Sequence, residues 1–166
     1  MYFVICLVRR ASSRDIDAIT EVINKSNYEA YKNIIPSKYF KHPFVNSEYI
    51  SNILNKWFIY VAEVNGKIVG CVCLEVNNDI GIIHHFYVLP EFQRKGIGSK
   101  LLAEMEMDAV GLGVREIRVY VDSKAYWAIS FYSKSGYEVN GLYRHVISED
   151  YHFLELVLCK KLSYTL

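Results

Sequence analysis

A short segment with two glycines, Gln93–Gly98, has the composition of a loop that binds phosphate groups. Because glycine lacks a Cβ, the backbone there can approach a ligand closely. The segment leads into a predicted helix, whose first N–H groups have no acceptor within the helix and lie at the positive end of its dipole. Arg94 and Lys95 add positive charge, and Ser99 adds a hydroxyl donor. Together these residues favour a pyrophosphate site.

The spacing of the glycines decides which nucleotide motif this segment can be. A P-loop requires G-x-x-x-x-G-K-[ST], which is absent. A dinucleotide fingerprint and the protein-kinase glycine loop both require a third glycine where Leu101 stands. Glu116 does lie twenty residues after Gly96, but it begins a predicted strand instead of ending one. The pattern therefore disfavours a nicotinamide or flavin oxidoreductase.

The elements around the segment are predicted from hydrophobic periodicity and from turn residues. Asn65-Gly66, between two β-rich runs, is a strong hairpin signal, and Leu89-Pro90 ends the strand that precedes the loop. Predicted strands cover Met1–Arg9, Phe58–Val64, Lys67–Val76, Ile80–Val88, Glu116–Val121, Tyr137–Ile147 and His152–Lys160. A predicted helix follows Ser12 or Ser13, with Ile16, Ile19, Val22 and Ile23 at helical spacing. Tyr28–Ile53 is expected to hold a short helix and a loop before a helix at about Ser47–Asn55, and further helices cover Ser99–Val110 and Tyr126–Ser135. The resulting order, β-α-α-β-β-β-α-β-α-β-β, predicts one α/β domain over residues 1–166 with a mixed sheet.

Composition sets limits on partners and compartment. The formal net charge of +1 does not call for nucleic acid or an anionic membrane as a partner. No stretch reaches the roughly 18 apolar residues that span a bilayer, and Met1–Val8 is not preceded by the basic residues of a signal peptide. The cysteines form no C-x-x-C pair, which suits reduced thiols in the cytoplasm. No metal-binding constellation is apparent.

A second motif narrows the choice of ligand for the glycine segment. Tyr87–Phe92 followed by Q-x-x-G-x-G resembles the acetyl-CoA-binding signature of the GNAT N-acetyltransferase superfamily. Ala128–Tyr132 followed by Gly136-Tyr137 resembles that family's A-x-x-F-Y-x-x-x-G-[FY] segment, in the expected order. The resemblance covers nearly the whole chain and is weakest over Tyr28–Asn55. It implies a mixed, mostly antiparallel sheet of about seven strands, splayed in the middle, with about four helices.

The resemblance also implies acetyl-CoA as co-substrate and a set of residues that contact it. Backbone N–H groups of the glycine segment would hold the pyrophosphate, and the pantetheine arm would lie where the strand through Val88 splays from Glu116–Val121. The implied contacts are Tyr87, Val88, Gln93, Arg94, Lys95, Gly96, Ile97, Gly98, Ser99, Ser123, Phe131 and Tyr132. Many relatives carry an asparagine seven residues before the tyrosine, where this chain has Ala125; Asp122 or Ser123 are candidate substitutes.

Transfer of an acetyl group to an amine needs a proton donor for the thiolate and stabilisation of the developing oxyanion. The resemblance assigns these roles to Tyr132 and to the Val88 N–H. Outside the motif, Tyr132 would more simply be a half-buried helix tyrosine. Direct attack in a ternary complex requires no protein nucleophile, although a general base helps a protonated amine.

His84 and His85 are adjacent on the strand that leads to Val88, so strict alternation predicts that they point to opposite faces. His84 stands where relatives often carry a carboxylate that acts as a general base, directly or through water. An imidazole, whose unperturbed pKa is about 6.5, can do the same. Both histidines can instead be structural.

The resemblance implies a primary amine as acceptor, either a small amine such as a polyamine or a protein N-terminus. Its residues are hard to identify from the sequence. Candidate carboxylates are Glu21, Glu29, Glu48 and Glu75, and candidate aromatic residues are Tyr28, Tyr31, Tyr39 and Phe40. A non-catalytic acyl-CoA-binding sensor is the alternative function, and the edge strands permit a homodimer.

Overall fold

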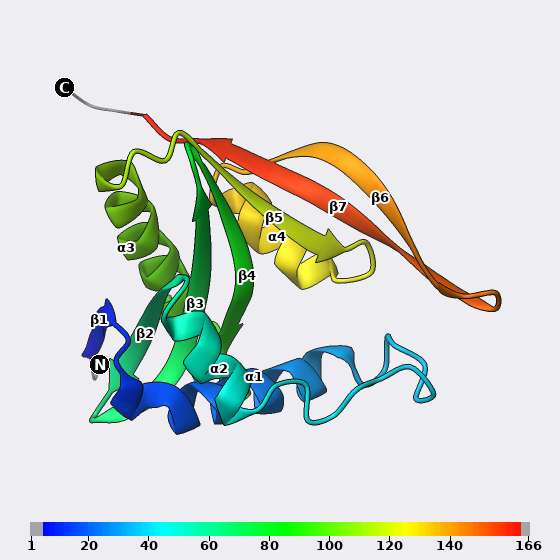
Figure 1. Ribbon diagram of the computed structural model, residues 1–166, viewed down its shortest axis with the longest axis horizontal. Coiled ribbons are helices and arrows are strands. Elements are labelled where there is room, and N and C mark those ends of the chain that lie inside the picture. Colours follow the sequence, from blue (N-terminus) through cyan, green and yellow to red (C-terminus); the bar gives the residue numbers. More distant parts are fainter. Residues whose placement is uncertain (1–4, 164–166) are drawn as a thin grey trace.

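The computed structural model describes residues 5–163, which form one mixed sheet with helices on both faces (Figure 1). The strands are β1 (Cys6–Arg10), β2 (Phe58–Val64), β3 (Lys67–Asn77), β4 (Ile80–Val88), β5 (Glu116–Asp122), β6 (Glu138–Ser148) and β7 (Tyr151–Lys161). The α-helices are α1 (Ile16–Tyr31), α2 (Ser47–Leu54), α3 (Ile97–Gly111) and α4 (Tyr126–Lys134), with short 3₁₀ turns η1 (Ser13–Asp15) and η2 (Pro90–Phe92). The predicted element order is confirmed.

The sheet has seven strands in the order β1-β2-β3-β4-β5-β7-β6. Every neighbouring pair is antiparallel except β4 and β5, which run parallel. That parallel pairing covers only Ile80–Ile83 against Glu116–Val119, so the strands separate over the second half of β4. The expected splay in the middle of the sheet is therefore present, and Figure 1 shows β4 and β5 diverging from their shared upper end.

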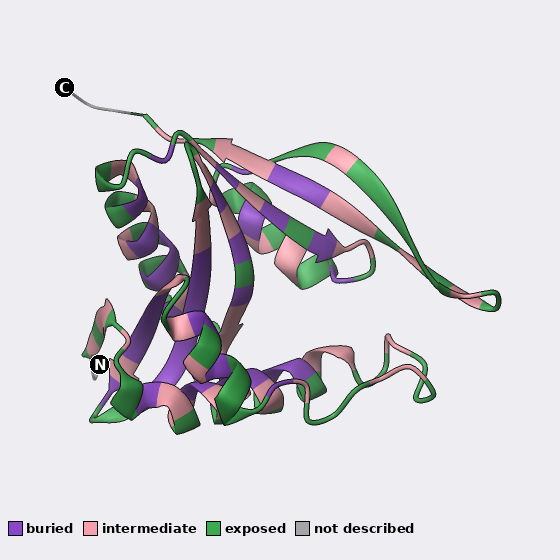
Figure 2. Ribbon diagram, in the orientation of Figure 1, coloured by how far each residue is buried: buried purple, intermediate pink, exposed green. Residues whose placement is uncertain are grey.

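The Asn65-Gly66 turn joins β2 to β3 as predicted. Asn65 has φ 51° and Gly66 has φ 78°, the two positive values that a tight hairpin turn requires. The strands on either side, β2 and β3, pair antiparallel from Val64↔Lys67 onwards. The hairpin thereby brings most of β3 into the buried centre of the sheet, which Figure 2 shows in purple.

Helix α1 is longer than the sequence suggests. Its buried residues recur at helical spacing and pack against β3 and β4, and they continue past the expected apolar run. They are Ile19, Val22, Ile23, Ser26 and Asn27. The short separate helix expected near Tyr28 is instead the last part of α1, which ends at Tyr31.

The first strand, predicted over Met1–Arg9, can be compared only from residue 5 onwards. β1 spans Cys6–Arg10, and Met1–Val4 lie outside the described residues. At the other edge of the sheet, β6 carries exposed apolar side chains, among them Leu142 and Val146. The homodimer suggested by the edge strands stays a prediction. Over residues 5–163, no helix combines the length and the apolar character needed to cross a membrane.

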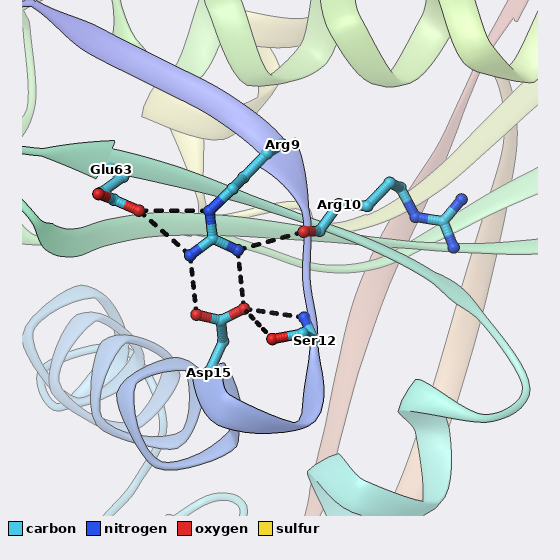
Figure 3. A network of polar contacts seen from close by, with 5 residues as sticks. All are labelled: Arg9, Arg10, Ser12, Asp15 and Glu63. Carbon is cyan, nitrogen blue, oxygen red and sulfur yellow. Dashed lines mark hydrogen bonds and ion pairs between the residues drawn. The ribbon is translucent and has the colours of Figure 1, made fainter.

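A polar network fixes the entry of the chain into α1 (Figure 3). Arg9 of β1 donates two hydrogen bonds to the Asp15 carboxylate, at 2.8 and 2.9 Å, and also contacts Glu63 of β2. The Ser12 N–H donates to Asp15 at 2.8 Å. These contacts, with the Arg9 guanidinium as the main cause, lower the pKa of Asp15 to about 2.

Replacing Asp15 with asparagine is expected to lower the free energy of unfolding by about 1–2 kcal/mol at pH 7, because an amide cannot accept both guanidinium bonds. The folded pKa lies below that of the unfolded chain, so this contribution is complete above about pH 4 and disappears as the pH falls towards 2. Urea unfolding at several pH values measures it. Asp17→Asn is the control, since its one bond, from the Ser47 hydroxyl at 2.8 Å, can be kept by an amide oxygen. An equal loss in both variants would contradict the prediction.

Candidate active site

The separated half of β4 presents its backbone to the gap beside β5. The Leu89 N–H donates to the Val69 carbonyl at 2.8 Å, so Val88 forms a non-hydrogen-bonded pair with Gly70. The N–H and carbonyl of Val88 therefore point away from β3, towards the side from which β5 has separated. The carbonyl accepts from the Gln93 side chain at 2.9 Å and from the Ser26 hydroxyl at 3.3 Å. Val88 thus has the orientation that an oxyanion donor needs.

The glycine segment joins η2 to α3 through two residues in the left-handed region. Gly96 has φ 79° and Arg94 has φ 61°, so the turn uses positive φ at a non-glycine residue as well. The first helical hydrogen bond runs from the Lys100 N–H to the Gly96 carbonyl at 3.0 Å. The N–H groups of Ile97, Gly98 and Ser99 precede that bond and are available to an anion.

Two polar side chains of the segment, those of Gln93 and Lys95, turn back towards the preceding residues. Gln93 holds the Val88 carbonyl, and the Lys95 ammonium donates to the Glu91 carbonyl at 3.1 Å and lies 5.3 Å from the centre of the Phe92 ring. Their roles as co-substrate contacts stay predictions. In this conformation the backbone, rather than these side chains, forms the anion-binding surface.

Gly98 has an ordinary backbone conformation and lies within van der Waals distance of Phe131. A Cβ at this position would meet the Phe131 ring at 3.5 Å. Phe131 in turn packs edge-on against Phe86 of β4, with ring centres 5.4 Å apart. This contact brings the start of α3, the middle of α4 and the separated part of β4 together, as the two motifs imply.

Tyr132 lies at the same place, on the buried side of α4. Its side chain is 5% exposed and packs against Phe86, Phe131 and Tyr137 at ring-centre distances of 5.3–6.1 Å. Burial raises the pKa of Tyr132, and the neighbouring Tyr31 and Tyr87 raise it further. Tyr132 therefore keeps its proton at neutral pH, as a proton donor must.

Tyr87 carries a contact that the sequence did not indicate. Its hydroxyl oxygen accepts a bond from the Asn27 amide of α1 at 2.9 Å. Burial raises the pKa of Tyr87 to about 12, although the Asn27 bond opposes this shift. The Oδ1 atom of Asn27 is buried and has no hydrogen-bond partner among the described residues. The end of α1 thus faces the gap with polar groups.

The two histidines do not point to opposite faces, contrary to the prediction. The β3–β4 register changes between Val72↔Phe86 and Leu74↔Ile83, so His84 and His85 together oppose one residue of β3. Such a β-bulge interrupts the alternation of side chains. Both imidazoles consequently lie near Trp57, with ring centres 4.1 Å from it for His84 and 6.4 Å for His85.

The bulged histidines have different partners. The His84 Nε2 atom lies 2.6 Å from a carboxylate oxygen of Glu75, and the imidazole is stacked on Trp57. The His85 Nε2 atom lies 2.8 Å from the Tyr49 hydroxyl of α2. Burial, with a smaller effect of His84, lowers the pKa of His85 to about 4. His85 is therefore a neutral structural residue, whereas the role of His84 as a base stays a prediction.

Because the folded pKa of His85 lies below that of an ordinary histidine, the unfolded chain binds more protons between pH 6.5 and 4. As the pH is lowered through this window, the stability of the fold should fall, by at most about 3–4 kcal/mol for this group. Replacing His85 with glutamine, which can still bond to Tyr49, should flatten the decline. Unfolding at stepped pH measures the effect. His84→Gln is the control, and an unchanged slope in His85→Gln would contradict the assignment.

Residues of the turn between β5 and α4 form hydrogen bonds that hold the turn in place. The Ser123 N–H donates to the Leu154 carbonyl of β7 at 2.8 Å, and Ala125 is fully buried just before α4. The Asp122 carboxylate accepts from the Lys124 N–H at 2.8 Å. Ala125 is therefore part of the core, and the co-substrate contact predicted for Ser123 is not tested by these bonds.

The aromatic residues named as acceptor candidates lie in different parts of the structure. Tyr28 contacts Phe40 and His42, with ring centres 6.0 and 4.8 Å away. Tyr31 contacts Trp127 of α4 at 5.9 Å, and Tyr39 lines a cavity beside the β6–β7 hairpin.

Among the carboxylate candidates, Glu29 pairs with Lys32, and Glu75 contacts His84. Glu21 lines a separate cavity of about 380 Å³ beside the β2–β3 turn, and no predicted site residue lines that cavity. In the part of the chain from residue 5 to residue 163, no group of three or more His, Cys, Asp or Glu side chains could hold a metal ion.

Comparison with known proteins agrees with this site. A family model described as the acetyltransferase (GNAT) family matches residues 23–137. A spermidine N(1)-acetyltransferase of Thermoplasma acidophilum is 28% identical over 142 residues, covering 80% of this chain and 88% of that protein. An aminoalkylphosphonate N-acetyltransferase of Salmonella typhimurium is 30% identical over 141 residues, covering 81% and 86%.

The structure of PaiA N-acetyltransferase from Thermoplasma acidophilum, in complex with coenzyme A, has the same fold. It superposes with a TM-score of 0.81 at 23% identity and covers 95% of this chain and 99% of that one. The splayed sheet, the start of α3 beside the split and the match to the family model together identify the class of protein as an acyltransferase. The chain belongs to the acetyltransferase (GNAT) family.

Proposed function

We propose that this protein transfers the acetyl group of acetyl-CoA to a small primary amine by direct attack in a ternary complex. The buried Tyr132 beside the unpaired half of β4 is the observation on which the proposal depends most. The free N–H groups at the start of α3 and the opening between β4 and β5 fit the pyrophosphate and the pantetheine arm of this co-substrate.

Each reacting group has a residue of this chain beside it. The Val88 N–H, directed into the gap, donates to the thioester oxygen as negative charge develops there. Tyr132 gives its proton to the CoA thiolate as the thioester bond breaks. His84, hydrogen-bonded to Glu75, removes a proton from the amine, directly or through water.

A small amine is favoured over a protein N-terminus. Both curated relatives above are named for small amine substrates. In this chain, Tyr39 of the loop after α1 bonds to Asp150 at the tip of the β6–β7 hairpin at 2.5 Å. This contact joins the loop after α1 to the β6–β7 hairpin and so limits the space between them for a peptide backbone.

A thiol-release assay with acetyl-CoA and a panel of amines tests the proposal. We expect amine-dependent release of CoA, with initial-velocity lines that intersect, as a ternary complex requires. Tight CoA binding without any amine-stimulated release would contradict the enzyme and support a non-catalytic acyl-CoA sensor. Acetylation of peptides with a free N-terminus in preference to all small amines would contradict the acceptor class.

A further inference from the structure

A cavity of about 120 Å³ lies on the acceptor side, between the loop after α1, the end of β5 and the β6–β7 hairpin. It is lined by Ile35, Tyr39, Asp122, Ile147, Tyr151 and Phe153. The rings of Tyr39 and Tyr151 are stacked with centres 4.6 Å apart, so they close the cavity on one side. The cavity therefore combines aromatic rings and aliphatic side chains with a single carboxylate.

That carboxylate has no cationic side chain beside it. None of the ion pairs formed within residues 5–163 includes Asp122, whose Oδ1 accepts only a backbone bond from Lys124. Two nearby carboxylates, in contrast, each lie beside a basic side chain. Glu155 lies 2.6 Å from His145, and Asp150 lies 3.2 Å from Lys38. A carboxylate without a counter-ion, beside aromatic rings, attracts an organic cation and repels an anion.

The cavity adjoins α4, the helix that carries Tyr132. Ile35, which lines the cavity, donates its N–H to the Tyr31 carbonyl at 3.0 Å, and the Tyr31 ring packs against Trp127 of α4 with ring centres 5.9 Å apart. On the other side, the Asp122 carbonyl accepts a bond from the Ala125 N–H at 2.9 Å, directly before α4 begins. A flexible molecule with one end beside Asp122 can therefore extend along α4 towards Tyr132.

We propose that this cavity, which we call the distal cation site, binds the non-reacting ammonium group of an acceptor that carries two or more amines. The inference rests on the proposed function and narrows its acceptor to di- and polyamines. The ammonium group lies against Asp122 and the rings of Tyr39, Tyr151 and Phe153, and the second amine reaches the thioester. The same charge disfavours acceptors with a phosphonate or carboxylate at the far end.

Steady-state kinetics with putrescine, butylamine and aminopropylphosphonate tests the site. These probes share a short alkylamine and differ at the far end, which is cationic, neutral or anionic. We expect kcat/KM to be at least about tenfold higher for putrescine than for butylamine, and lowest for the phosphonate. In Asp122→Asn the putrescine-to-butylamine ratio should fall about tenfold, mainly through the KM for putrescine.

Asp79→Asn is the matched control, because it makes the same substitution at an exposed position in the β3–β4 turn and does not line the cavity. It should keep the wild-type ratio. The asparagine at position 122 can still accept the Lys124 bond, and turnover of butylamine reports that Asp122→Asn is folded.

An equal putrescine-to-butylamine ratio in the wild type and in Asp122→Asn, or an equal fall in Asp79→Asn, would overturn the distal cation site while leaving the acetyltransferase activity in place. Absence of turnover with every amine would instead refute the proposed function, and the distal cation site with it.

Discussion

Replacing Tyr132 with phenylalanine should lower kcat by about one hundred- to one thousandfold, the usual contribution of a well-placed general acid. The aromatic packing against Phe86 and Phe131 should survive, because the variant loses only a hydroxyl. The dissociation constant for CoA should therefore change little. Pre-steady-state or steady-state thiol release, together with calorimetric titration of CoA, separates the two effects.

The pKa of Tyr132, although raised by burial, does not argue against this role. Burial also raises the pKa of a thiol, and in the interior it raises the pKa of Cys71 to about 12. Burial acts in the same direction on a thiolate formed beside Tyr132, because it raises the proton affinity of the thiolate and so favours transfer from the tyrosine hydroxyl.

Tyr126→Phe provides the matched control for the missing hydroxyl. Tyr126 is on the same helix but 74% exposed, so its hydroxyl is in solvent. The control should retain wild-type kcat. Full activity in Tyr132→Phe would show that water or another residue protonates the thiolate.

Replacing Gly96 with valine should weaken CoA binding by roughly tenfold or more. A β-branched residue is strongly disfavoured at φ 79°, so the turn must change conformation and the free N–H groups at the start of α3 must move. A Cβ at this position meets nothing within 4 Å, so the effect comes from backbone strain and not from a clash. Calorimetric titration of CoA measures it.

Gly66→Val is a close control for the same strain. Gly66 has φ 78°, and a Cβ there also meets nothing within 4 Å, but the residue belongs to the β2–β3 turn. Both variants should lose about 1–3 kcal/mol of stability, and only Gly96→Val should lose CoA affinity. Equal CoA affinity in the two variants would argue against the glycine segment as the pyrophosphate site.

Local sequence patterns predicted much of the fold. The bounds of β2 and β4 match the prediction residue for residue, because each strand is an apolar run that ends at a turn residue or a proline. The motif around Gly96 and Gly98 also placed the start of α3 within two residues. These signals are local, so they can be detected without the tertiary structure.

The features that were missed depend on pairing between distant segments. The bulge at His84 and His85 is defined by the register against β3, which alternation along one strand cannot reveal. The distal cation site combines Tyr39, Asp122 and Phe153 from three separate segments. Nothing near Asp122 in the sequence indicates a cavity, so local patterns cannot predict this site.

The divergence of β4 from β5 also has a consequence for the stability of the protein in the cell. Over His84–Val88, strand β4 has no hydrogen-bonded neighbour on the β5 side. An unpaired strand edge therefore lies inside the domain instead of at the rim of the sheet. A co-substrate arm that pairs with β4 would supply that missing neighbour to the folded chain only. Ligands that bind only the native state add stability according to their concentration, about 2.7 kcal/mol at one hundred times the dissociation constant. The abundance of this protein would then follow the cellular supply of acetyl-CoA, independently of any change in its synthesis.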